Sequence, residues 1–112
     1  MSGANLSGAI LKEVNLARAT LTGANLGEAD LEGASLAWAN LARATLNGAN
    51  LNGANLEYVH LNGANLNGVD LTGADVTGIK LTIEQIQQIL VVSKPNENPE
   101  RLLKRFLKKN EK

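Results

Sequence analysis

A repeat of five residues runs without interruption from Ala4 to Ile83 and limits this chain to a small set of folds. The central position of the repeat is Leu at every fifth residue from Leu6 to Leu81, sixteen positions of which only Val76 differs. Ala lies two residues before the central position in twelve of the sixteen units, and Gly lies two residues after it in nine. Asn or Asp commonly stands between the Ala and the Leu, so the unit reads Ala-Asn-Leu-x-Gly.

A period of five matches neither regular secondary structure. Leu residues spaced in this way would spiral around an α-helix of about 3.6 residues per turn, and a long strand repeats every two residues. The Ala and the Leu are two positions apart, so they point to one side of a short extended segment and the residue between them points to the other. The Gly supplies the positive φ of a tight type II turn. Repetition of segment and turn predicts a solenoid whose coils stabilise one another.

The run of Ala-Asn-Leu, Ala-Asp-Leu and Ala-Thr-Leu units resembles the pentapeptide-repeat proteins over about 80 of the 112 residues. The resemblance implies an all-β solenoid, a right-handed four-sided parallel β-helix with four units per coil, and therefore about four coils. It places the Ala and the central residue inside and the other three positions outside. The central residues expected in the core include Leu6, Leu26, Leu31, Leu46, Leu51 and Leu66.

Helix signals begin where the repeat ends, which divides the chain into a β-helix, residues 1–82, and a helical cap with a basic tail, residues 83–112. Thr82 and Gln85 are spaced as a capping box, and a second helix is predicted further along. An open solenoid end exposes apolar interior and unpaired strand groups, so these helices are expected to cover the last coil. Their apolar faces contain Ile83, Ile86, Ile89, Leu90, Leu103 and Phe106.

The second helix is also basic and amphipathic, as are segments that lie on anionic membranes or enter a partner's groove. Its apolar face spans only two turns, which is short for binding a membrane or a partner's groove. The uncovered end of the solenoid nearby requires apolar cover. Capping is therefore the favoured interpretation, and membrane contact through the basic tail is not expected. A monomer, or a weak dimer through an uncovered solenoid end, is predicted.

Residues that carry common catalytic and metal chemistry are scarce. The chain has no Cys and a single His, His60, at an outward position, so neither a zinc site nor a His-based nucleophile relay can be assembled from the usual ligands. Carboxylate pairs such as Asp30 and Asp70 would lie on a convex surface without a cleft to shift their pKa values. No catalytic residue, metal, cofactor or small-molecule substrate is predicted.

One column of outward residues stands out when the chain is wound at twenty residues per coil. Arg18, Trp38, Tyr58 and Gly78 then stack at the same corner, which brings the single Trp and the single Tyr together. One interpretation is an internal ladder in which the guanidinium and the two rings stack. The other is a protein-binding patch, because Trp, Tyr and Arg most often anchor interfaces. The two interpretations are compatible.

These patterns predict a non-enzymatic scaffold or protein-interaction module with an unidentified protein partner. An alternative comes from the resemblance, since some pentapeptide-repeat proteins resemble B-form DNA and occupy the DNA site of type II topoisomerases. This chain differs in its short repeat region, its formal net charge of zero and its Leu in place of Phe at the interior centre, so this reading is disfavoured and no nucleic acid partner is expected. Without an apolar run near the roughly 20 residues of a membrane span, or a secretory signal, a cytoplasmic location is expected.

Overall fold

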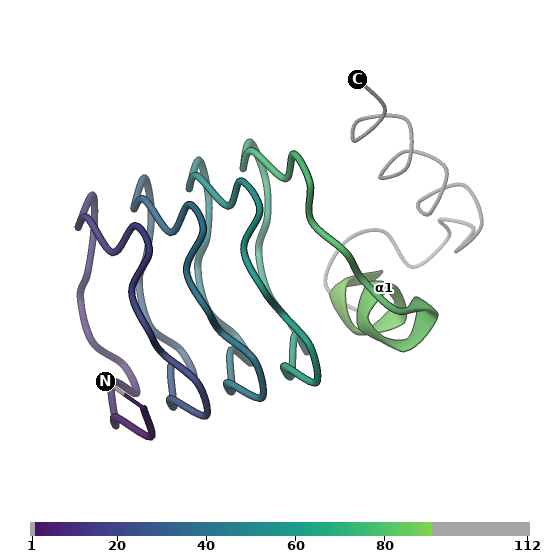
Figure 1. Cartoon of the computed structure of the whole chain (residues 1–112), viewed down its shortest axis with the longest axis horizontal. Coiled ribbons are helices and arrows are strands. Elements are labelled where there is room, and N and C mark those ends of the chain that lie inside the picture. Colours follow the sequence, from purple (N-terminus) through teal and green to yellow (C-terminus); the bar gives the residue numbers. More distant parts are fainter. Residues whose placement is uncertain (1, 91–112) are drawn as a thin grey trace.

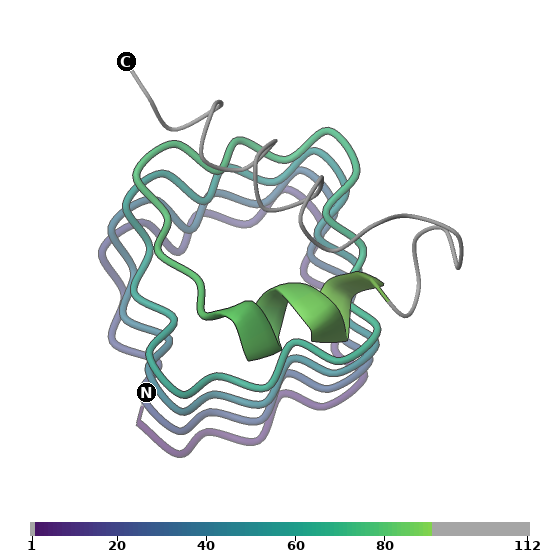
Figure 2. The ribbon, with the colours of Figure 1, turned by 90° about the vertical axis from the view of Figure 1, so that its right-hand side faces the viewer.

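The computed structural model describes residues 2–90, in which the chain winds into a stack of coils (Figure 1). Isolated parallel bridges join residues twenty positions apart, from Asn5 with Asn25 to Asn55 with Asp75. Each bridged segment is a single residue long, so the described repeats contain no longer strand. The offset of twenty places four five-residue units in each coil, and Figure 2 shows the four sides that these units form.

Each corner of a coil is a turn closed by one backbone hydrogen bond. The amide of the residue after the turn donates to the carbonyl of the central residue, as the amide of Ala9 does to Leu6 at 3.0 Å. The residue two positions after the central residue has a positive φ at every corner from Gly3 to Gly78. Glycine adopts this conformation without steric cost, which explains its recurrence. Six corners carry another residue at this position: Glu13, Arg18, Glu28, Trp38, Arg43 and Tyr58.

The Asn or Asp before the central residue stabilises the turn that follows. Its side-chain oxygen accepts a hydrogen bond from the amide two positions later, as Asn40 Oδ1 does from Ala42 at 3.0 Å. This is the Asx-turn geometry for which these residue types are suited. Hydrogen bonds from the side chain and the backbone of Thr72 lower the pKa of Asp70 below its ordinary value. The recurring Asn and Asp residues therefore have a structural role at the corners.

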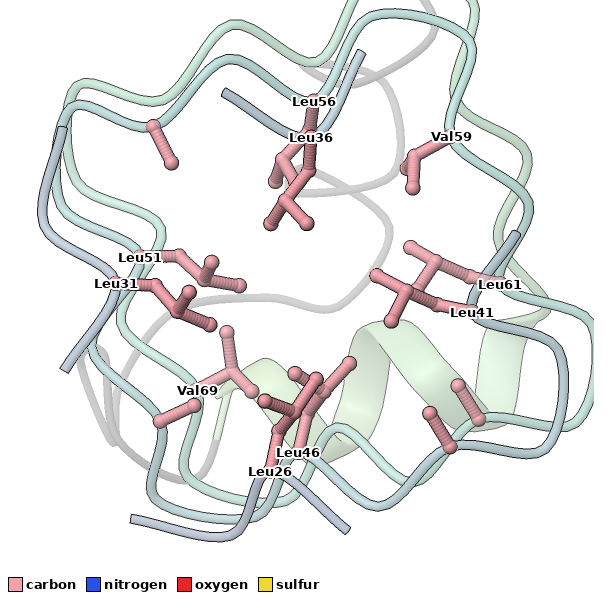
Figure 3. Packing of buried hydrophobic residues seen from close by; sticks show 14 of the residues in the cluster. Leu26, Leu31, Leu36, Leu41, Leu46, Leu51, Leu56, Val59, Leu61 and Val69 are labelled. Atoms are coloured by element: carbon pink, nitrogen blue, oxygen red, sulfur yellow. The ribbon is translucent and has the colours of Figure 1, made fainter. Parts of the chain in front are cut away.

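The interior of the solenoid is filled by the central Leu residues and by the Ala residues two positions before them. Figure 3 shows Leu side chains of successive coils lying one above the other, for example Leu41 with Leu61. Leu6 is only partly buried, because a single neighbouring coil packs against it. The other core residues named from the sequence are at most 2 % exposed: Leu26, Leu31, Leu46, Leu51 and Leu66. Each buried Leu stabilises the fold by about 1.5–3 kcal/mol.

Helix α1, Ile83–Leu90, lies across the end of the last coil (Figure 2). It begins with the capping box expected from the sequence. The amide of Gln85 donates to Thr82 Oγ1 at 3.1 Å, and the amide of Thr82 donates to Gln85 Oε1 at 3.0 Å. The two bonds satisfy amides that the first turn of a helix otherwise leaves without partners.

The buried face of α1 differs from the one expected from the sequence. Ile86 and Ile89 are buried, but Ile83 is 61 % exposed, and its place on the buried face is taken by Gln85, which is 5 % exposed. Burial of Gln85 turns the helix so that Ile83 faces away from the coil. The side chain of Leu90 lies outside the described residues, as do Leu103 and Phe106.

Two glutamine side chains of α1 make hydrogen bonds to backbone groups at the open end of the stack. In the inner coils, groups equivalent to the Ala64 carbonyl and the Leu66 amide bond to the backbone of the next coil, whereas the Leu61 carbonyl also accepts the turn hydrogen bond from Ala64. Gln85 Nε2 donates to the carbonyls of Leu61 and Ala64 at 2.7 and 3.1 Å. Gln88 Oε1 accepts from the amide of Leu66 at 2.9 Å. Because a buried polar group without a partner costs about 1–3 kcal/mol, these side-chain amides stabilise the end of the stack.

We expect Leu46→Asp to unfold much of the solenoid, because a charge without a partner would be buried between two coils. The neighbouring substitution Asn47→Asp introduces the same charge at an outward position and serves as the control. The free energy of unfolding, measured with urea, should fall by more than about 3 kcal/mol in the first variant and by less than about 0.5 kcal/mol in the second. Equal losses in the two variants would contradict the inward assignment of the central residues.

We expect Gln85→Ala to lower the free energy of unfolding by about 1–3 kcal/mol, because the carbonyls of Leu61 and Ala64 lose their side-chain donor and the capping box is broken. Gln87→Ala is the matched control, since Gln87 is exposed on the same helix and gains the same helix propensity. Urea unfolding of both variants measures the difference. If both were as stable as the unmodified protein, Gln85 would not stabilise the end of the stack.

Candidate protein-interaction site

The polar groups of the described surface do not assemble into a metal site, and their ion pairs are exposed to solvent. Among residues 2–90 no group of three or more His, Cys, Asp or Glu side chains could hold a metal ion. The ion pairs of this segment join Lys12 with Asp30 and Glu32 at 3.8 and 3.7 Å, and all three side chains are solvent-accessible. Such pairs contribute little to stability. No helix in this part of the chain has the length and hydropathy needed to span a membrane.

Three large side chains stack at one corner of the solenoid, and we call Arg18, Trp38 and Tyr58 the ladder. The rings of Trp38 and Tyr58 lie 4.6 Å apart between centroids, with an interplanar angle of 18°. Cζ of Arg18 lies 5.8 Å from the centroid of the Trp38 ring. The structure thus brings together the three residues that the sequence placed in one column. Each contact of this kind contributes about 0.5–1.5 kcal/mol.

The spacing of the coils explains why the ladder forms. Hydrogen-bonded parallel segments lie about 4.8 Å apart. The amide of Trp38 donates a hydrogen bond to the carbonyl of Glu57, and the amide of Tyr58 donates one to the carbonyl of Thr77. Equivalent corners of successive coils therefore lie one above the other. Flat groups attached at these corners therefore meet near the distance at which aromatic rings stack.

A side chain at the corner position leans over the same corner of the following coil. A Cβ atom added to Gly48 would lie 2.9 Å from Oε2 of Glu28, and one added to Gly63 would lie 3.3 Å from Cγ of Arg43. A bulky corner residue therefore favours Gly at the next corner of its column. The ladder departs from this pattern, because flat side chains can lie parallel where other shapes would collide.

The backbone of the ladder is in the left-handed region at each residue. Arg18, Trp38 and Tyr58 have φ values of 65°, 64° and 55°. For residues other than Gly this conformation costs about 1–2 kcal/mol each. In the other three corner columns of the described repeats, no two successive corners both carry a residue other than Gly. The ladder thus concentrates backbone strain at one edge of the molecule.

The ladder is partly open to solvent. Trp38 and Tyr58 are 48 % and 44 % exposed, although their faces are stacked. The residues that precede Arg18 and Trp38 are Ala17 and Ala37, whose small side chains cover little of the rings. Within residues 2–90 Arg18 forms no ion pair. The accessible surface of the ladder therefore consists of ring edges and a guanidinium group.

The end of the ladder at Gly78 has a steric reason that the sequence analysis did not find. A Cβ atom at Gly78 would overlap the ring of Tyr58, which leans over this corner. The sequence placed Gly78 in the column without assigning it a role. The sequence shows that Gly78 lies twenty residues after Tyr58. It does not show in which direction the Tyr58 side chain leans, so the steric need for Gly at this corner could not be inferred.

The repeat, the corner turns and the twenty-residue register agree with a match to known sequences. Residues 1–37, 34–73 and 49–82 match a family model described as pentapeptide repeats, in eight copies. This chain belongs to the pentapeptide-repeat family. The resemblance noted from the sequence is thereby confirmed.

Several solved pentapeptide-repeat proteins are similar to this chain. One from the thylakoid lumen of Arabidopsis thaliana is 25 % identical, with 91 % of this chain and 85 % of that chain covered and a TM-score of 0.49. HetL of Nostoc sp. strain PCC 7120, involved in heterocyst differentiation regulation, is 29 % identical over 70 % of this chain and 47 % of its own, with a TM-score of 0.27. QnrB1, a plasmid-mediated fluoroquinolone resistance protein, is 20 % identical over 68 % of this chain and 45 % of its own, with a TM-score of 0.31.

The alignments with HetL and QnrB1 thus span about half the length of each of those proteins. No curated protein matches this sequence.

We expect Gly78→Ala to destabilise this pentapeptide-repeat protein more than Gly53→Ala does. Both glycines have a positive φ, so Ala costs about 1 kcal/mol of strain at either position. Only Gly78 lies under a side chain, and its Cβ would displace the Tyr58 ring, whereas a Cβ at Gly53 meets no atom within 4 Å. Urea unfolding and the near-ultraviolet circular dichroism of the ladder measure the difference. Identical behaviour of the two variants would contradict the leaning of Tyr58 over Gly78.

Proposed function

We propose that this pentapeptide-repeat protein is a non-enzymatic scaffold, a four-coil β-helix covered at one end by α1, and that it binds another protein through the ladder. The observation that carries the proposal is the strained but exposed placement of Trp38 and Tyr58. Both occupy corners where Gly would be free of strain, and both leave nearly half of their surface in solvent. A ladder that served stability alone would gain more from burial of the same rings.

The ladder has the chemistry of an interface anchor. Binding energy concentrates in a few large residues, among which Trp, Tyr and Arg are enriched. Stacking holds Trp38 and Tyr58 in one arrangement before a partner arrives, so little side-chain entropy is lost on binding. Most other outward positions of the repeats carry Asn, Thr, Ser, Ala or Gly, which offer small, solvated contacts.

The proposal assigns no reaction to the chain, in line with a family whose members are generally structural or interaction proteins. DNA mimicry, the alternative considered from the sequence, gains no support from the described charges. Continuous negative potential would be needed to imitate a nucleic acid duplex, whereas Lys12, Arg18, Arg43 and Lys80 interrupt the acidic residues. A cytoplasmic location stays a prediction.

Partner capture from lysate of the source cell tests the proposal, with the ladder removed by the double substitution Trp38→Gly and Tyr58→Gly. Glycine suits the left-handed corners, so the variant should keep the circular dichroism of the folded protein. We expect it to capture at least about tenfold less partner, which corresponds to about 1.4 kcal/mol.

The control is the double substitution Glu13→Gly and Glu28→Gly, which changes the same turn position at two other corners, both outside the ladder. It should leave capture unchanged. If the folded ladder variant captured the same proteins in the same amounts as the control, the ladder would not be the binding site.

A further inference from the structure

The charged side chains of the repeats are distributed unevenly around the solenoid. The side that follows the ladder corner in each coil is named the basic face and consists of residues 19–22, 39–42, 59–62 and 79–82. His60 and Lys80 lie on this face, and both are exposed. Arg18 and Arg43 lie at the corners on its two borders, with their backbones in the corner conformation.

Most acidic residues of the described segment lie elsewhere. None of the eight acids between residues 2 and 90 is on the basic face itself, although Glu57 directly precedes Tyr58 in the ladder turn and Glu84 directly follows Ile83. The other six are away from the face and its borders: Glu13, Glu28, Asp30, Glu32, Asp70 and Asp75. With four units per coil, the unit that contains Asp30 and Glu32 is two units away from the basic face and therefore opposite to it. Lys12 belongs to that opposite side and pairs there with both acids. In the described segment, the four basic groups of the basic face and its borders form no ion pair.

Exposed apolar side chains gather at the same place. Four large hydrophobic residues of the described segment are exposed, and three of them border the basic face. Trp38 and Tyr58 form its ladder border, and Ile83 follows its last residue directly in the chain. Only Ile10 is exposed on another side. The basic face thus combines cations that lack acidic partners with apolar surface.

We propose that the basic face binds an acidic segment of the partner protein that also carries apolar side chains. The proposal rests on the proposed function and names the chemistry of its partner. Carboxylates of the segment meet Arg18, Arg43 and Lys80, and its apolar side chains pack against the edges of the ladder rings. Cations that are not neutralised by ion pairs attract such a segment and repel a basic one.

A single-stranded nucleic acid would also offer negative charge, but the ladder is poorly suited to it. Bases bind by stacking on the faces of aromatic rings. Both faces of Trp38 are already covered, one by Arg18 and the other by Tyr58, and Tyr58 in turn lies over Gly78. Ring edges carry positive partial charge and suit carboxylate and carbonyl oxygens instead. The geometry therefore favours an acidic polypeptide.

The single Trp of the chain gives a direct readout, because the indole N–H signal in a ¹⁵N nuclear magnetic resonance spectrum belongs to Trp38. The probes are a short unlabelled peptide of Glu, Leu and Ser, the same peptide with Lys for Glu, and a single-stranded thymidine oligonucleotide of equal length. We expect the acidic peptide to shift the Trp38 signal saturably and its affinity to fall with added NaCl. The basic peptide should produce no shift. Equal or tighter binding of the oligonucleotide would overturn the proposal.

Charge variants locate the binding. Arg43→Gln with Lys80→Gln removes two cations of the basic face without changing the ladder, and we expect about threefold or greater weakening of acidic-peptide binding. Lys12→Gln removes a cation from the opposite side and should leave the affinity unchanged. Equal affinities in the two variants would overturn the assignment to the basic face.

Capture of the natural partner separates this inference from the proposed function. If capture requires the ladder but is insensitive to NaCl and to the Arg43→Gln and Lys80→Gln substitutions, the ladder binds a partner and the acidic-segment proposal is wrong. If capture does not require the ladder, the proposed function itself is wrong. Loss of capture both in the Trp38→Gly and Tyr58→Gly variant and in the Arg43→Gln and Lys80→Gln variant supports both proposals.

Discussion

The parallel hydrogen-bond register between coils, in which each residue of the repeats lies over the residue twenty positions later, is the constraint on which the rest of the structure depends. It aligns the central Leu residues into interior columns and the corner residues into exterior ones. Because neighbouring coils are held about 4.8 Å apart, the interior side chains pack against those of the next coil, and the ladder side chains stack. The effect of a substitution on stability therefore depends first on the residues twenty positions before and after it.

The corners show how this constraint selects residue types. Every corner residue has a positive φ, which favours Gly, and a side chain at a corner leans over the next coil, which favours Gly there again. Arg18, Trp38 and Tyr58 are tolerated in succession because flat groups can stack at the coil spacing. The strain and the exposure of these three residues underlie the proposal that they bind a partner protein.

At the end of the stack the hydrogen-bond register between coils stops, because no further coil follows the last one in the repeats. The last coil still presents amides and carbonyls along its open edge, and α1 supplies partners for some of them through Gln85 and Gln88. Apolar cover comes from Ile86 and Ile89. The end is thus stabilised by polar as well as apolar contacts, since burial of backbone groups without partners would offset the gain from burying the isoleucines.

The five-residue period determined by itself which side chains point inward and where the chain turns, because these features follow from local geometry within a single unit. The capping-box spacing of Thr82 and Gln85 indicated where α1 begins. The resemblance to pentapeptide-repeat proteins implied twenty residues per coil, which brought Arg18, Trp38 and Tyr58 into one column. Only the tertiary structure decided that corner side chains lean toward the following coil, that Gln85 and not Ile83 faces the last coil, and that Ile83, at the start of α1, is left exposed beside the basic face. These outcomes depend on contacts between residues about twenty positions apart and on hydrogen-bond groups left open at the end of the stack, which no periodicity within the sequence records.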